Sequence, residues 1–380
     1  MRDILDQIIK WWDAGETFGL ATVVRTFSSA PREPGAALAV STGGEVVGSV
    51  SGGCVEGAVY ELSGEVTANG EPVLQRYGVS DDTAFSVGLT CGGIIDIFVE
   101  PVSRERYPDL GEIAEAVRAG EPVAVATVIE GPGKIGARRV IWPADGEPRA
   151  SEPSVNVPVP SGTLGSGDRL DQAVDDDARG MLAQGLTGVR HYGADGERRM
   201  DELSVFVQSF APPPRMLVFG AIDFAAAVAR IGKFLGYRVT VCDARPVFAT
   251  TARFPDADEV VTDWPHRYLS GVTTDERTVI CVLTHDPKFD VPVLEVALRA
   301  PAAYIGAMGS RRTHEDRLDR LREAGMSEEE LARLRSPVGL DLGARTPEET
   351  AVAIAAELIQ LRWGGSGQPL TSTAGRIHHD

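Results

Sequence analysis

Two cysteines with paired glycine neighbours are the residues of this sequence that point most directly to chemistry. One ends the run Ser51-Gly52-Gly53-Cys54, and the other begins Cys91-Gly92-Gly93. Glycines leave a thiol unshielded, and their backbone N–H groups can bind an anion or lower the pKa of the thiol. A soft thiolate can contact sulfur or a late metal centre. We therefore predict a functional role for both cysteines, with a tight structural turn as the alternative.

The other two cysteines have a different setting. Cys242 ends the strand-like run Tyr237-Arg-Val-Thr-Val-Cys242, and Cys281 stands among apolar residues in Val279-Ile-Cys-Val-Leu283. Both are predicted to be core residues. None of the four cysteines forms a CxxC pair, so neither a zinc finger nor a disulfide framework is indicated, and no histidine or carboxylate is spaced to complete a metal site.

Two polar loops follow strand-like segments in the last third of the chain. His285 and Asp286 come after residues 278–283, and Gly309-Ser-Arg-Arg312 comes after residues 302–305. His285 can act as an acid or base near neutral pH, although a structural histidine is the alternative. The hydroxyl and guanidinium groups of the second loop suit an anionic group. Its alternative is a helix amino-terminal turn with solvated arginines.

The outline of a dinucleotide-binding βαβ unit begins at Gly220. A strand precedes this glycine, and a helix and a second strand lead to Asp243 and Arg245, close to the ~20-residue spacing of an acid that contacts ribose. Ile222 stands where a second glycine would let the backbone approach a pyrophosphate. We predict a weakly bound nucleotide, NAD(P) or a similar ligand here. A Rossmann-like scaffold without a ligand is the alternative.

The elements that position these residues indicate an α/β and α+β multidomain protein. Short strand-like runs and an amphipathic first helix predict a β-rich domain over residues 1–103. A second part covers 104–210 and contains a flexible insertion at 145–160 that is rich in Pro, Ser and Glu. After the Pro212-Pro-Pro214 linker, strands alternate with helices over 211–364, which predicts a Rossmann-like doubly wound parallel sheet. Residues 365–380 are predicted to be a disordered tail.

The second part is predicted to be a degenerate repeat of the first. Four short motifs recur in the same order and at nearly constant distance. Ala21-Thr-Val-Val24 and Ile95-Asp-Ile-Phe-Val99 return as Ala126-Thr-Val-Ile129 and Leu203-Ser-Val-Phe-Val207. The remaining two pairs are Gly48–Cys54 with Gly162–Asp168, and Arg76-Tyr-Gly78 with His191-Tyr-Gly193. The repeat places Asp168 opposite Cys54 and has no counterpart of Cys91.

Composition excludes several classes of protein. The chain has 380 residues, is 43% hydrophobic and 24% charged, and carries a formal net charge of −18, which argues against binding to nucleic acid. No apolar run is long enough for a membrane helix, and the first residues carry no apolar signal core. We expect a soluble cytoplasmic protein, with a homodimer as the base-rate expectation.

Taken together, six ordered motifs make the chain resemble the XdhC/CoxI family of molybdenum-enzyme accessory proteins. The resemblance covers most of the chain. The motifs are Ser29-Ala-Pro-Arg-Glu-Pro-Gly35, Gly48-Ser-Val-Ser-Gly-Gly-Cys-Val-Glu56, Gly88-Leu-Thr-Cys-Gly-Gly93, Leu283-Thr-His-Asp286, Tyr304-Ile-Gly-Ala-Met-Gly-Ser-Arg-Arg312 and Gly339-Leu-Asp-Leu-Gly-Ala-Arg-Thr-Pro-Glu348. Two positions depart from the family pattern, namely Gly220-Ala-Ile-Asp-Phe224 for the usual G-A-G-H-V turn, and Thr90 where glycine is frequent.

The resemblance implies a protein that transiently holds the molybdenum–pterin cofactor and assists its sulfuration by a cysteine desulfurase. The cofactor then passes to xanthine dehydrogenase or a related molybdenum hydroxylase. Cys54, Cys91 and His285 are the candidate reactive residues on this interpretation. The candidate cofactor-binding residues are Arg32, Ser51, Gly52, Gly53, Glu56, Gly92, Gly93, Gly220, Asp243, Arg245, Asp286, Gly309, Ser310 and Arg311.

Two other functions stay open. The βαβ outline is also compatible with an NAD(P)-dependent oxidoreductase, and a non-catalytic protein that recruits the desulfurase would not need its cysteines. The chain lacks the cysteine sets of iron–sulfur clusters and is far too short for a complete molybdenum hydroxylase. A maturation chaperone is therefore favoured over a stand-alone enzyme.

Overall fold

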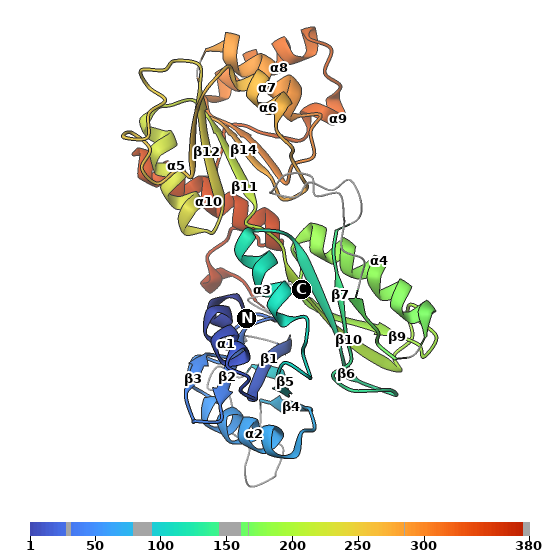
Figure 1. Cartoon of the computed structure of the whole chain (residues 1–380). Coiled ribbons are helices and arrows are strands. Elements are labelled where there is room, and N and C mark those ends of the chain that lie inside the picture. Colours follow the sequence, from blue (N-terminus) through green and yellow to red (C-terminus); the bar gives the residue numbers. More distant parts are fainter. Residues whose placement is uncertain (28–31, 79–92, 144–160, 166, 285, 375–380) are drawn as a thin grey trace. The chain divides into compact units, whose positions relative to one another are not determined.

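The computed structural model describes residues 1–27, 32–78, 93–143, 161–165, 167–284 and 286–374 (Figure 1). They divide into two compact units, Met1–Pro212 and the residues from Pro213 onward. The first unit contains two antiparallel sheets and the second a parallel one, which confirms the predicted fold class. No helix in these parts of the chain is long and apolar enough to cross a membrane.

The two halves of the first unit have the same order of elements and the same strand order. The first sheet runs β3-β2-β1-β5-β4 and the second runs β8-β7-β6-β10-β9. The elements of the first half are α1 (Leu5–Asp13), β1 (Phe18–Phe27), β2 (Ala37–Ser41), β3 (Val46–Gly48), α2 (Glu56–Asn69), β4 (Val73–Tyr77) and β5 (Ile94–Val102). Those of the second are α3 (Leu110–Ala119), β6 (Val123–Glu130), β7 (Arg138–Ile141), β8 (Ser161–Gly162), α4 (Asp168–Gln184), β9 (Gly188–Tyr192) and β10 (Leu203–Phe210).

A glycine at the same place in each half shows how closely the backbones correspond. Gly48 and Gly162 end β3 and β8 with φ of 85° and 82°. A Cβ added to either would lie 2.2 or 2.4 Å from a carbonyl oxygen of the neighbouring strand, Ala37 or Arg138. Only glycine combines this left-handed conformation with so close an approach.

Successive side chains of the central strands point to opposite sides of their sheet, and both sides are apolar. In β1, Ala21 and Val23 pack under α2, whereas Val24 joins a cluster with Ile129 and Phe206 of the second sheet. The second sheet repeats this arrangement with α4 on its outer face. The unit therefore consists of two sheets packed face to face, with α2 and α4 on the outside.

Charged side chains join the halves as well. The guanidinium of Arg25 in β1 donates to Glu130 (3.2 Å) and to Ser204 Oγ (2.8 Å) of the second half, and it lies 3.5 Å from Asp96 of its own half. Deeper between the sheets, Arg138 of β7 donates to Glu100 of β5. Only about a tenth of either side chain of this deeper pair is exposed.

The second unit is a six-stranded parallel sheet in the order β13-β12-β11-β14-β15-β16. Numbered along the chain, this is the 3-2-1-4-5-6 order of dinucleotide-binding folds, and the order reverses between β11 and β14. Its elements are β11 (Arg215–Phe219), α5 (Asp223–Phe234), β12 (Arg238–Asp243), β13 (Glu259–Thr262), α6 (Pro265–Gly271), β14 (Val279–Val282), α7 (Pro287–Ala297), β15 (Tyr304–Ala307), α8 (Arg311–Glu323), α9 (Glu328–Leu331), β16 (Leu334–Arg335) and α10 (Pro347–Trp363).

Two later helices of this unit begin with capping boxes, and a short turn lies in the segment after the last helix. Ser327 and Thr346 form complete capping boxes with Glu330 and Glu349 at the starts of α9 and α10. Residues 365–374, which were expected to be disordered, contain a 3₁₀ turn at Leu370–Ser372. Proline at 369 restricts the backbone at this point, an effect that the Gly and Ser content of the segment concealed.

The buried pair between the two halves leads to the first prediction. Glu100→Gln keeps the shape of the side chain but leaves the buried guanidinium of Arg138 without a counter-charge. We expect the free energy of unfolding to fall by about 3 kcal/mol, measured by urea denaturation. The double variant Glu100→Leu/Arg138→Met should recover most of this loss.

Asp6→Asn is the matched control, because Asp6 forms an exposed ion pair with Arg118 across the same two halves (2.9 Å). Its loss should be below about 1 kcal/mol. A Glu100→Gln effect no larger than that of Asp6→Asn would contradict a structural role for the buried pair.

Candidate functional site

Cys54 lies in the loop between β3 and α2, and hydrogen bonds within this loop hold its conformation. The carboxylate of Glu56 accepts from the hydroxyls of Ser49 (2.7 Å) and Ser51, and from the backbone N–H groups of Ser51 (2.9 Å) and Gly53 (2.8 Å). Ser51 Oγ in turn accepts from the N–H of Cys54 (2.9 Å). The loop is therefore fixed by its own side chains before any ligand binds.

Cys54 is half-buried and packs against the cluster beneath α2. Gly52 and Gly53 have φ of 76° and 119°, with open space where a Cβ would stand. Side chains at these two positions would therefore meet no neighbouring atoms within 4 Å. The N–H groups of the two glycines, which were expected to be available to a ligand, already donate to Ser49 Oγ and Glu56.

The hydrogen bonds to Glu56 have an electrostatic consequence. Burial opposes ionisation, but the Ser51 and Ser49 hydroxyls and the backbone N–H of Ser51 outweigh it and lower the pKa of Glu56 from 4.5 to about 2. The carboxylate thus acts as an internal anion in the loop that carries Cys54.

The carboxyl edge of the parallel sheet contains the other candidate residues. Gly220 has a φ of 110°, and a Cβ there would lie 2.8 Å from Thr284 Cγ2, so the turn after β11 requires glycine. Asp243 at the end of β12 accepts from the N–H of Ala221 (2.7 Å) and from the Arg245 side chain (2.8 and 2.9 Å). Burial opposes its ionisation, yet these hydrogen bonds keep the pKa of Asp243 below its usual range.

A cavity of about 580 Å³ lies at the same edge. Gly309 and Ser310 line it from the loop after β15, Phe224 from α5, and Arg345 from the turn before α10. Arg311 is exposed on α8 and does not line this cavity. Of the predicted residues of this loop, Gly309 and Ser310 therefore line the cavity, whereas Arg345, which was not predicted, lines it in place of Arg311. Arg345 lies inside the last of the family-like motifs, directly before the Thr346 cap.

Three loops of this edge are tied together by one buried arginine. Arg317 of α8 donates to Asp290 (2.9 Å), to the carbonyl oxygen of Met308 (2.8 Å) and to Ser336 (3.0 Å), and Thr284 donates to the same Asp290. Arg317 is only 2% exposed. Sequence reasoning missed it because its helix, Arg311–Glu323, is otherwise rich in exposed charges.

Of the remaining candidate residues, Asp286 lies at the same carboxyl edge, where it interacts electrostatically with Arg245. Arg32 is exposed, and Asp286 caps α7 by accepting from the N–H of Lys288 (3.1 Å). Gly93 lies immediately before β5. Cys91, Gly92 and His285 lie outside the described residues. In the described part of the chain, no group of three or more His, Cys, Asp or Glu side chains is arranged to hold a metal ion.

A duplicated antiparallel unit followed by a Rossmann-type unit defines the class of protein, and comparison with known proteins names its family. The family model described as the XdhC Rossmann domain matches residues 216–358. The model described as the XdhC and CoxI family matches residues 11–78 and 116–193, one segment in each half of the first unit. The chain belongs to the XdhC and CoxI family.

Relatives match over nearly the whole chain. A probable xanthine dehydrogenase subunit of Bacillus subtilis is 28% identical over 90% of this chain and 92% of its own length. The molybdenum cofactor insertion chaperone PaoD of Escherichia coli is 27% identical over 95% and 88%. A crystal structure described as a xanthine dehydrogenase from Bacillus halodurans has the same fold, with a TM-score of 0.66, 24% identity and 97% coverage of both chains.

The Glu56 hydrogen bonds predict a pH-dependent contribution to stability. Because the folded-state pKa lies below the ordinary value of 4.5, the contribution is complete above pH 4.5 and disappears as the pH falls toward 2. Glu56→Gln should lower the free energy of unfolding by about 1–2 kcal/mol at pH 7, after allowance for solvent screening. Urea denaturation between pH 7 and pH 3 should show this difference shrinking.

Glu65→Gln is the control, since Glu65 is an exposed carboxylate of the same helix, α2. It should change stability by less than about 0.5 kcal/mol at every pH. A Glu56→Gln difference that stays constant from pH 7 to pH 3 would show that the carboxylate charge is not the stabilising feature.

Proposed function

We propose that this protein is a chaperone of the molybdenum cofactor, which assists sulfuration of the cofactor and its insertion into a molybdenum hydroxylase of the xanthine dehydrogenase type. The observation that carries this proposal is the match to PaoD over nearly the whole length of both chains, because PaoD is a cofactor insertion chaperone. The likeness to the probable xanthine dehydrogenase subunit of Bacillus subtilis supports the class of client.

The chemistry of the described residues suits a metal that arrives as cargo. The molybdenum of this cofactor is already bound to a pterin, so a chaperone needs a few soft or polar contacts and no protein cage. Cys54 is half-buried in a loop that Glu56 fixes, directly after two glycines with open space at their Cβ positions. On this proposal Cys54 and Cys91 contact the cofactor or its sulfur.

The carboxyl edge of the parallel sheet would then receive an anionic part of the cofactor. Its cavity combines the backbone of Gly309 and Ser310 with the guanidinium of Arg345 at the start of a helix, and helix amino-termini favour anions. Arg317 holds the walls of this cavity in place. A cysteine desulfurase as the sulfur donor and a homodimer as the assembly stay predictions.

The cysteine contact is tested by metal and pterin analysis. The protein is purified from cells supplied with molybdate, and molybdenum and the fluorescence of oxidised pterin are measured per chain. We expect both in the wild type, and a loss of about tenfold or more in Cys54→Ala and Cys91→Ala. Activation of a co-expressed xanthine dehydrogenase should fall in parallel.

Cys242→Ala is the control, because it removes a thiol that is 1% exposed in β12 and should leave the molybdenum content unchanged. Wild-type protein without molybdenum or pterin, even with the client present, would contradict the chaperone function. Unchanged client activation by both cysteine variants would instead favour a protein that only recruits the desulfurase.

An NAD(P)-binding oxidoreductase is the second candidate, favoured by the strand order of the parallel sheet. The ribose-binding acid of such a site is occupied here, because Asp243 accepts hydrogen bonds from Ala221 and Arg245. We therefore expect calorimetric titration with NAD and NADP to give dissociation constants above about 1 mM. Micromolar binding of either would favour the oxidoreductase.

A further inference from the structure

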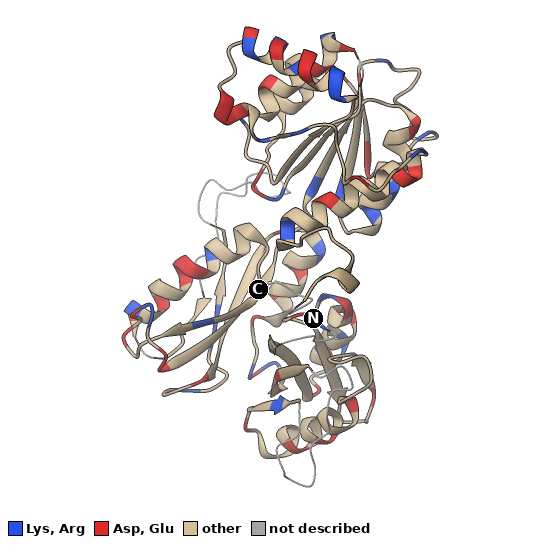
Figure 2. Cartoon of the chain, turned by 180° about the vertical axis from the view of Figure 1, so that it is seen from behind, with Lys and Arg blue, Asp and Glu red and all other residues tan. Residues whose placement is uncertain are grey.

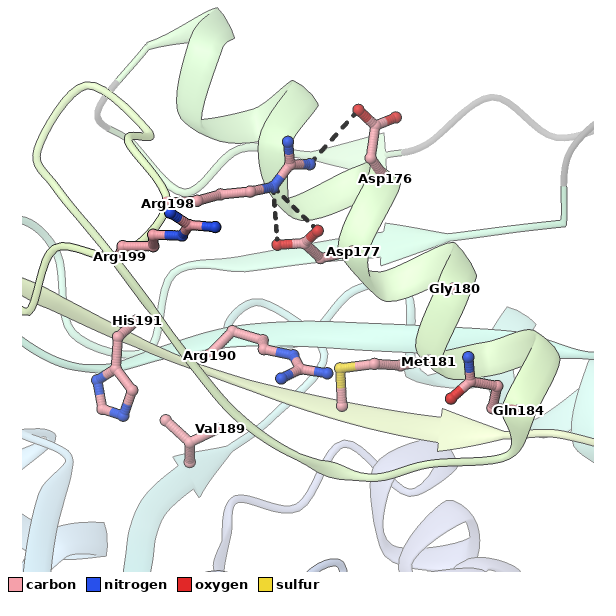
Figure 3. Close-up of a pocket in the computed structure, with 10 residues that line it drawn as sticks. All are labelled: Asp176, Asp177, Gly180, Met181, Gln184, Val189, Arg190, His191, Arg198 and Arg199. Atoms are coloured by element: carbon pink, nitrogen blue, oxygen red, sulfur yellow. Dashed lines mark hydrogen bonds and ion pairs between the residues drawn. The ribbon is translucent and has the colours of Figure 1, made fainter.

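The second half of the first unit contains a pocket that lies apart from both candidate sites. It has a volume of about 460 Å³ and lies between α4 and the hairpin that joins β9 to β10 (Figure 3). Met181 and Val189 form an apolar part of its wall, and Arg190 extends across it toward Met181. Pockets of this size take small molecules.

The charges in this pocket do not balance. Arg198 donates to Asp177 (3.1 Å) and lies 3.7 Å from Asp176, which also lies 4.0 Å from Arg179. Among the residues that the structure describes, the guanidinium groups of Arg190 and Arg199 have no hydrogen bond or ion pair. Two positive charges are therefore left without partners in a chain whose formal charge is −18.

The backbone at Arg199 is strained as well. Its φ is 73°, and within the described ranges it is the one residue other than glycine with a positive φ. A left-handed conformation is unfavourable for a residue with a Cβ, and such strain is concentrated at binding and catalytic sites. Glycine would fit this turn without strain, so arginine at 199 indicates a role for its side chain.

The first half lacks this cationic lining. Arg190 pairs with Val205 across β9 and β10, and its counterpart Gln75 pairs with Ile97 across β4 and β5. The amide of Gln75 donates to the carbonyl oxygen of Arg76 (3.0 Å). At the position of Arg190, the half that carries Cys54 therefore has an uncharged side chain.

We infer that this pocket binds a phosphate monoester. A dianionic phosphate matches the two unpaired guanidinium charges in number, and a guanidinium can offer two parallel N–H groups to phosphate oxygens. The apolar wall at Met181 and Val189 has room for the group attached to the phosphate. This inference does not rest on the proposed function, because the pocket shares no residue with the Cys54 loop or with the cavity at Arg345.

Calorimetric titration of the full chain tests the inference with phenyl phosphate as the probe, and with inorganic phosphate and benzoate beside it. Phenyl phosphate should bind more tightly than inorganic phosphate, and benzoate, with one charge, most weakly. Arg190→Gln and Arg199→Gly should each raise the dissociation constant for phenyl phosphate about tenfold. Arg199→Gly should do so without lowering the melting temperature, because it removes the strain.

Arg169→Gln is the matched control. It removes one exposed positive charge from α4, the helix that lines the pocket, but Arg169 itself lies outside the pocket, so binding should be unchanged. No binding of phenyl phosphate by the wild type would overturn the inference. It would also be overturned by equal effects of Arg169→Gln and Arg190→Gln, which would indicate a general charge effect. Benzoate binding as tightly as phenyl phosphate would overturn the assignment to a phosphate.

Discussion

The first unit depends on one constraint: each of its sheets has two apolar faces, and both must be covered. Helix α2 covers the face that carries Ala21 and Val23, and α4 covers the corresponding face of the second sheet. The opposite faces are buried partly against each other, through Val24, Phe98, Ile129 and Phe206, and partly beneath α1 and α3, which share one core with strand residues of both sheets. The two halves therefore share part of their core.

This mutual burial also explains how the halves came to differ. Positions that face each other across the sheets carry complementary groups, such as Arg25 against Glu130, and Arg138 against Glu100. The halves also differ on the outside. One half retains the Gly-Gly-Cys loop, whereas the other has an arginine-lined pocket between α4 and β9. Acidic residues are spread over the helices of both units, with basic residues interspersed (Figure 2).

Sequence patterns predicted the fold class well because its signals are local and periodic. Alternation in Phe18–Phe27, the ordered repeat of short motifs and the strand–helix rhythm after Pro214 all follow from backbone geometry. Family motifs located the Cys54 loop and the Gly309–Ser310 loop. Pairing across the chain was not predictable, since nothing near Arg317 in the sequence indicates that Asp290, Met308 and Ser336 surround it.

The same limit explains the main difference at the candidate sites. The glycine runs at Gly52–Gly53 and Gly220 indicate backbone N–H groups that could bind a ligand anion. In the fold, a carboxylate of the chain already accepts from the N–H of Gly53 in one loop and of Ala221 in the other, namely Glu56 and Asp243. These carboxylates are bound tightly enough to lower their pKa values.

An acidic chain thus supplies its own anions at both glycine turns, and this restricts what a ligand can contact there. In the first unit the half-buried thiol of Cys54 suits a soft centre such as sulfur or molybdenum better than a phosphate. On the two proposals made above, anionic groups would instead contact guanidinium groups elsewhere, at Arg345 in the second unit and at Arg190 and Arg199 in the first. Soft and anionic ligand groups are consequently assigned to different parts of the chain.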